Sequence, residues 1–373
     1  MFEVGPPTSR PRSEKRLVLG YVVLVCLALA HAIYNGYSEY ATEISSSHTG
    51  LTEEQFSKLH YTKPLSASHP IFVGQDFAPN QYRIGVVYVA KFVSDRLHIT
   101  KYYGMYAVID FISAVATCYC LYRLLCLSAF LLRRSSPSQA VLLAFFLATL
   151  IFPLSWVVPW ERQETLPSAL YLVLILLLLR LIKNQPLWLT AVLFLTLWQD
   201  IVRTDVAAVF GVAVILLSFS SYGKKLFGSK RLGLASGLLI AGVSAAAQYT
   251  LKHILYPHAV YPPDTPSVVL YYNFSSARSA TTYLIALLPY IVLLVLAWKH
   301  RKQLDPEDML ALSASVLYLP LWCIFGLLGE VRIFVPFLLA LTPTAAKVMV
   351  ILLDGSSPVA EIRQTSEVSA VLL

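Results

Sequence analysis

The chain has 373 residues, of which 57% are hydrophobic and only 13% are charged, with a formal net charge of +8. Soluble domains carry about 25% charged residues, so the composition excludes a soluble globular protein. The basic residues stand in clusters between hydrophobic runs, which is typical of membrane proteins, and we expect no nucleic acid partner. We therefore predict an all-α, polytopic bundle of transmembrane helices surrounded by membrane lipids.

Hydropathy predicts about ten spans in a single integral membrane domain over 1–373, because several apolar runs approach the ~20 residues that cross a bilayer. The first, at 17–34, is a signal anchor, since no small-residue cleavage site follows it. A long extracytoplasmic loop, 35–103, comes next, and a short tail, 354–373, ends the chain. The other spans are predicted at 104–132, 140–158, 167–183, 187–199, 205–221, 232–251, 280–298, 310–328 and 333–353.

Basic residues predict the orientation, because cytoplasmic loops carry an excess of Lys and Arg. Both termini are then cytoplasmic, which agrees with an even number of spans, and we expect a multi-pass protein of the bacterial inner (plasma) membrane. The ends assigned to the cytoplasm carry Arg10, Arg12, Lys15, Arg16, Arg133, Arg134, Arg180, Lys183, Lys224, Lys225, Lys230, Arg231, Lys299, Arg301 and Lys302.

Three carboxylates in the first outer loop are candidate catalytic groups. Glu39 and Glu43 follow the first span in YNGYSEYATE, and Asp76 lies between Gly74 and Pro79. Aspartate at such a position is often a turn former. The alternative is a carboxylate held at the interface, where it acts as a general base.

From Tyr82 to Leu97 apolar and charged residues are interleaved, which predicts an amphipathic helix of 16 residues. Such a helix lies on the membrane surface rather than across it. Arg83, in the run QYRIG at its start, is a candidate substrate-binding residue.

The stretch QDIVRTD places Asp200, Arg203 and Asp205 between two apolar segments. We predict an extracytoplasmic hairpin with these charges near the outer interface. One interpretation is a polar turn with an internal ion pair. The other is a substrate-binding site, because ionisable groups at membrane depth are costly and usually line a site or pathway. The preceding span, 187–199, is short, so it is either tilted or ends inside the protein.

The second charged turn, GEVRIF, contains Glu330 and Arg332 between the last two spans, with hardly any loop to solvate them. They either cap the turn as a structural pair or bind substrate. The forked donors of an arginine suit a phosphate group.

A long first outer loop with an interfacial helix, after an inward-anchored first span, resembles the membrane glycosyltransferases of the GT-C superfamily. The resemblance covers the start of the chain and the overall topology. It implies transfer of a sugar from a polyprenyl-phosphate carrier to a glycan or lipid acceptor at the extracytoplasmic face, with inversion at the anomeric carbon. The family has an acidic residue close behind the first helix, often an Asp-Glu or Asp-x-Asp pair. Here only Glu39 and Glu43 occupy that place, and Asp76 lies later.

The resemblance also implies roles for the charged residues. Asp76 or Glu39 would deprotonate the acceptor hydroxyl, and Arg203 or Arg332 would neutralise the phosphate leaving group.

Two other functions remain open. In a transporter or lipid flippase, the outer charged residues would line a gated path. Such proteins often have paired halves with broken helices at matching positions, whereas the prolines of this chain do not match between its halves. A non-enzymatic membrane scaffold would tolerate alanine at Asp76, Arg203 and Arg332. We expect no cofactor and no metal, since His253 and His258 have no third ligand nearby.

Overall fold

The computed structural model describes residues 85–98, 102–128, 165–182, 185–255, 277–325 and 331–355, with single positions at 23, 27, 257 and 274. This part of the chain is all-helical, as predicted. The predicted span at 140–158 and most of 17–34 lie outside the described residues. So do five candidate site residues, Glu39, Glu43, Asp76, Arg83 and Glu330.

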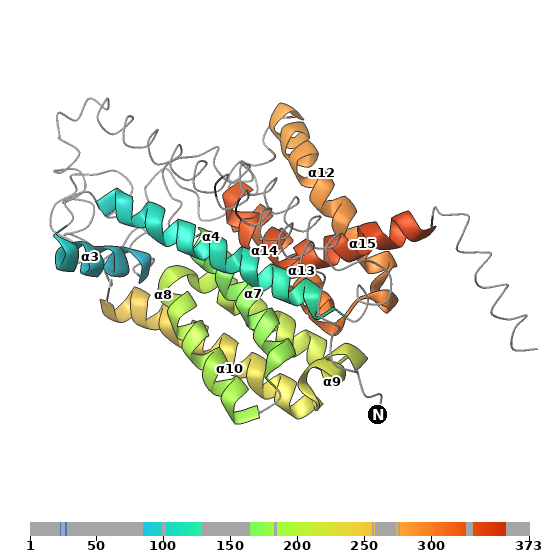
Figure 1. The fold of residues 1–373 in the computed structure, drawn as a ribbon, viewed down its shortest axis with the longest axis horizontal. Coiled ribbons are helices and arrows are strands. Elements are labelled where there is room, and N and C mark those ends of the chain that lie inside the picture. Colours follow the sequence, from blue (N-terminus) through green and yellow to red (C-terminus); the bar gives the residue numbers. More distant parts are fainter. Residues whose placement is uncertain are drawn as a thin grey trace, which may run out of the picture.

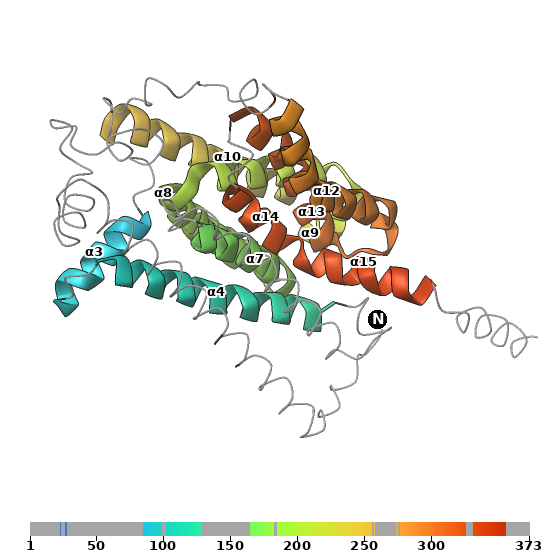
Figure 2. The same ribbon diagram turned by 90° about the horizontal axis from the view of Figure 1, so that it is seen from above.

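Ten α-helices and several short 3-10 or π segments make up the described fold (Figures 1 and 2). Five of the predicted spans each overlap one helix: α4, α7, α10, α12 and α13. The elements are α3 (Gly85–Leu97), α4 (Tyr102–Cys126), α7 (Thr165–Leu181), α8 (Gln185–Ser218), α9 (Ser221–Phe227), α10 (Lys230–Tyr249), η2 (Thr250–Leu255), α12 (Ala277–Lys299), η3 (Arg301–Gln303), α13 (Pro306–Phe325), η4 (Val331–Phe334), α14 (Val335–Ala340) and α15 (Thr342–Gly355).

Four stretches are long and apolar enough to cross a membrane: Ala107–Cys126, Pro186–Ser218, Lys230–Leu255 and Pro306–Ile324. The helices over Thr165–Leu181, Tyr290–Lys299 and Thr342–Leu352 are apolar but shorter. These lengths are compatible with a membrane protein. The predicted last span, 333–353, is divided among η4, α14 and α15, with a turn at Leu341 just before Pro343, which lacks a backbone N–H.

Helix α8 bends sharply at Arg203, whose φ of −165° and ψ of 95° are not helical. Tyr171 of α7 shows how sharp the bend is. Its hydroxyl lies 3.3 Å from Thr196 Oγ1, and its ring centroid lies 6.3 Å from that of Phe210. Thr196 and Phe210 are fourteen residues apart, so in a straight helix they would be about 21 Å from one another. That distance is too great for the single side chain of Tyr171 to contact both. The sequence predicted a hairpin at QDIVRTD, and the structure has a bend at this position.

The second half of α8 packs closely against α10 through glycines. A Cβ on Gly237 would lie 2.8 Å from Ile215 N and 3.0 Å from Gly211 O. A Cβ on Gly211 would lie 2.8 Å from Ala241 N. The backbones of the two helices therefore touch, which is how small residues allow membrane helices to associate.

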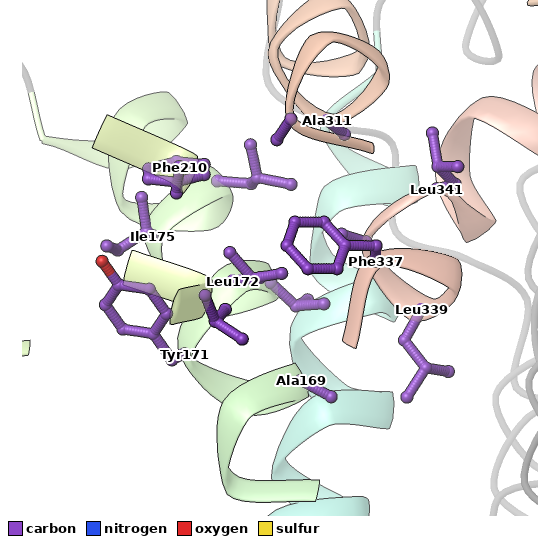
Figure 3. Close-up of a cluster of buried hydrophobic side chains, with 14 of the residues drawn as sticks. Ala169, Tyr171, Leu172, Ile175, Phe210, Ala311, Phe337, Leu339 and Leu341 are labelled. Atoms are coloured by element: carbon purple, nitrogen blue, oxygen red, sulfur yellow. The ribbon is translucent and has the colours of Figure 1, made fainter. Parts of the chain in front are cut away.

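Helix α7 is the central helix of the bundle. Its sequence, TLPSALYLVLILLLLRL, is apolar on all sides, and most of its residues are buried, as expected for a helix that other helices surround. Figure 3 shows its side chains gathered with those of the neighbouring helices α8, α13 and α14; the labelled ones include Tyr171, Leu172, Ile175, Phe210, Ala311 and Phe337.

Helix α3 corresponds to the predicted amphipathic helix and begins at Gly85. Val86 and Ala90 are buried, and a Cβ on Gly85 would lie 3.0 Å from side-chain atoms of both Ile201 and Val202. One face of α3 thus packs on the bundle beside the bend of α8, whereas Phe92 on its other face is exposed.

Candidate functional site

Arg203 is the centre of a polar cluster at the bend of α8. Its Nε donates to Asp205 Oδ1 at 3.0 Å, and its Nη2 donates to Asp205 Oδ2 at 2.9 Å. Nη2 also donates to the hydroxyl of Tyr318 on α13, and that hydroxyl donates to Asp205 Oδ2 at 2.7 Å. We call Arg203, Asp205 and Tyr318 the Arg203 cluster. Its bidentate pair is a strong and directional type of ion pair.

The two charges of this cluster differ in exposure. The Arg203 side chain is 3% exposed and that of Asp205 is 47% exposed. The bend therefore buries the cation, whereas the carboxylate is about half exposed. The bend buries Asp200 and Arg203 among the helices, whereas the position of all three charges of QDIVRTD near the outer interface stays a prediction.

This geometry changes the role expected of Arg203. Its charge is already balanced by Asp205, so it is less suited to neutralise a phosphate than a free arginine would be. Its two parallel donors instead hold the carboxylate of Asp205 in one orientation.

Aromatic side chains from α13, η4 and α14 position Tyr318. Its ring stacks on Phe337 with centroids 4.2 Å apart and lies 5.8 Å from that of Phe334. Phe334 in turn contacts Tyr290 and Trp322 at 4.3 and 4.4 Å. Phe334 ends η4, so the backbone of this segment, which includes the predicted residue Arg332, runs beside the Arg203 cluster.

Gln199 and Asp200 lie just before the bend. Gln199 Nε2 donates to Ser168 Oγ at 2.8 Å and to the carbonyl oxygen of Arg203 at 2.9 Å, which ties the bend to the start of α7. Asp200 is 0% exposed, and among the described residues neither of its carboxyl oxygens has a well-aligned hydrogen bond, although the hydroxyl of Ser244 on α10 lies close to it.

A second polar cluster joins the end of α4 to the starts of α13 and α15. Lys347 Nζ donates to Asp305 Oδ2 at 2.7 Å and to Asp308 Oδ2 at 2.5 Å. Ser128 donates to Asp305 Oδ2 at 2.8 Å, and Thr344 donates to Asp308 Oδ1 at 3.1 Å. We call these five residues the Lys347 cluster. Arg180 lies beside it, with its Nη1 3.2 Å from Glu307 Oε1.

The Lys347 cluster stabilises the fold and has no room for a sugar. Burial by itself would raise the pKa of Asp305, but Lys347 and the hydroxyl of Ser128 hold that pKa below its usual value. The cavity beside these side chains measures about 20 Å³, which is enough for an ordered water. We therefore assign this cluster to joining helix ends rather than to binding substrate.

Sequence reasoning missed Tyr318 and the Lys347 cluster. Tyr318 stands in an apolar run with no local signal of its role. Lys347 did carry a signal, since a lone lysine inside a predicted span requires a partner, and its partners are the acidic residues at the start of α13.

No group of three or more His, Cys, Asp or Glu side chains is placed to hold a metal ion within the described ranges. Comparison of the chain with protein-family models, with curated proteins and with solved structures gives no match.

Proposed function

We propose that the chain is a polytopic membrane glycosyltransferase that uses a polyprenyl-phosphate-linked sugar at the extracytoplasmic face, with Asp205 in its substrate site. The supporting observation is a half-exposed carboxylate that accepts hydrogen bonds from buried Arg203 and from Tyr318. A carboxylate accepts further hydrogen bonds through its remaining lone pairs. Fixed in this way, Asp205 is suited to orient a hydroxyl of the sugar or of the acceptor.

The distribution of basic residues supports a position of the Arg203 cluster at the extracytoplasmic face. The hydroxyl of Tyr222 on α9 donates to the carbonyl oxygen of Arg301. Arg301 is close in sequence to Asp305, which bonds to Lys347. The basic turns that contain Lys224 and Arg301 therefore lie at the Lys347 end of the bundle. By the positive-inside rule that end is cytoplasmic. Tyr318 is ten residues after Asp308 along α13, about 15 Å towards the opposite end.

Exposed side chains on α3 support a position at the membrane interface. Tyr88 and Phe92 are exposed on one face of this short helix, and the guanidinium of Arg96 lies 5.3 Å from the ring centre of Phe92. Apolar side chains on one face and a cation beside them suit the boundary between lipid headgroups and acyl chains. Together with the spans outside the described residues, this completes the proposed arrangement of about ten membrane helices.

The catalytic steps then involve residues beyond the described ranges as well. A carboxylate of the first loop, Asp76 or one of Glu39 and Glu43, takes the proton of the acceptor hydroxyl as its oxygen attacks the anomeric carbon. The bond between that carbon and the phosphate oxygen breaks, and the phosphate leaves with its negative charge. Arg332 is better suited than Arg203 to meet that charge, because Arg203 is already paired.

A transfer assay on the protein in liposomes, with a panel of polyprenyl-phosphate sugars, tests the proposal. Asp205→Asn removes the charge but keeps the shape. We expect turnover to fall about 10- to 100-fold, since a hydrogen bond to a charged group contributes about 1.5–3 kcal/mol. Lys225→Gln, an exposed change at the opposite end, is the matched control and should transfer at the wild-type rate. Equal turnover in both variants would remove Asp205 from the site.

The orientation has its own test, which does not depend on activity. Single cysteines at Ser46 and Asp264 should react with a membrane-impermeant thiol reagent added from outside, and one at Lys224 should react only after permeabilisation. Labelling of Lys224→Cys from outside would place the Arg203 cluster at the wrong face for the proposed reaction.

Transport is the second candidate function, and one observation favours it. Helix α8 is broken inside the bundle next to the buried carboxyl of Asp200, and broken helices with buried ionisable groups are frequent in transporters. Movement of a lipid-linked sugar across proteoliposomes without transfer to an acceptor would favour this function.

A further inference from the structure

Asp200, inside α8, differs from Asp308, a deeply buried carboxyl near the start of α13. Asp308, whose side chain is 3% exposed, accepts from Lys347, from Thr344 and from the backbone N–H of Asp305. Asp200 is 0% exposed, and within the described part of the chain the hydroxyl of Ser244 approaches its carboxyl without forming a well-aligned hydrogen bond. The described residues therefore give Asp308 several well-formed hydrogen bonds and give Asp200 none that is well aligned.

No counter-charge is directed at Asp200 from the described elements around it. Arg203, three residues along α8, points its guanidinium at Asp205 and Tyr318. Tyr171 on α7 faces the carboxyl but bonds to Thr196. Ser244 on α10 also faces the carboxyl, and its oxygen forms no well-aligned hydrogen bond within the described residues. Asp95 and Arg96 are exposed at the end of α3 that is far from Gly85.

A lone ionised carboxylate in such a place is strongly unfavourable, and a buried group avoids this by becoming neutral. A proton requires no cavity, so full enclosure of the side chain does not prevent it from binding. We propose that Asp200 is a proton-binding site in the bend of α8, with a neutral carboxylic acid facing Ser244.

The position of this site links the proton to the conformation of α8. Loss of the proton would leave a bare charge among α7, both halves of α8 and α10, so proton release requires the bend to open and admit water or a cation. Arg203 and Asp205 follow three and five residues later, so such an opening would also move the Arg203 cluster. This inference does not rest on glycosyl transfer and applies equally to a transporter.

Infrared spectroscopy of the protein in lipid tests the proposal, because a protonated carboxyl has a carbonyl stretch separate from that of a carboxylate. We expect this band at pH 7 in the wild type and its loss in Asp200→Asn. It should be retained in the matched control Asp305→Asn, because the Asp305 carboxylate is kept charged by Lys347 in the wild type. Absence of the band at pH 7 would overturn the proposal, as would a band that persists unchanged in Asp200→Asn.

Two further measurements keep the test decisive. If Asp200→Asn does not fold, Asp200→Glu retains the acid and should shift the band, because aspartic and glutamic acid absorb at different frequencies. A carboxylate signal that changes on addition of sodium chloride, with no protonated band in its absence, would identify a bound cation instead and would contradict the proton site.

Discussion

Replacing Lys347 by methionine removes the cation of the Lys347 cluster while keeping most of the aliphatic stem. The lysine side chain is 4% exposed and bonds to carboxylates that are 16% and 3% exposed. Removing one partner from a buried ion pair destabilises a protein by about 3–5 kcal/mol, because it leaves uncompensated charge. Ser128, Thr344 and the Asp305 N–H still donate to the two carboxylates, so we expect the lower end, about 3 kcal/mol.

Reversible unfolding in mixed micelles, followed by circular dichroism, measures this loss. Glu307→Gln is the matched control at the same helix end. Its partner Arg180 is 28% exposed, and a partly exposed pair contributes about 1 kcal/mol or less. The triple variant Lys347→Met, Asp305→Asn and Asp308→Asn should recover most of the stability, since it removes the charges together. A loss for Lys347→Met no larger than that of Glu307→Gln would refute the reasoning.

Two further predictions concern helix packing and pH. Gly237→Ala should lower the free energy of unfolding by about 1–3 kcal/mol because its Cβ meets the backbone of α8. Gly242→Ala on the same helix meets nothing within 4 Å and should stabilise by up to about 1 kcal/mol; equal effects in unfolding titrations would contradict the contact. The lowered pKa of Asp305 predicts a contribution to stability that is complete above its unfolded pKa of about 3.9 and is lost as the pH falls through its folded pKa. Unfolding measured from pH 7 down to pH 3 should show this loss in the wild type but not in the triple variant. The same loss of stability in both proteins would contradict the prediction.

The helices could be predicted from the sequence because the bilayer requires long apolar runs, and these are visible without any knowledge of tertiary contacts. The bend in α8 could be predicted for the same reason, since three charges interrupt such a run. The burial of the bend among other helices could not be predicted. A surface hairpin and a bend within the bundle have the same local sequence, and only packing on α7 and α10 buries Asp200 and Arg203.

The partners of the charged residues were harder to predict than the helices. Tyr318 contacts Asp205 across 113 residues of sequence, and Lys347 contacts Asp308 across 39. Such pairs depend on how the helices are arranged around one another, which local composition does not encode. The predicted ion pair within QDIVRTD is an exception, because Arg203 and Asp205 are only two residues apart and the bend brings their side chains together.

The central claim, that the protein acts on a polyprenyl-phosphate sugar, is tested most directly by purifying it in native lipids and identifying the bound lipid by mass spectrometry. We predict a polyprenyl phosphate, with or without its sugar, retained by the wild type and reduced in Asp205→Asn. A wild-type protein that retains only bulk phospholipids, identical to those held by Asp205→Asn, would contradict the claim.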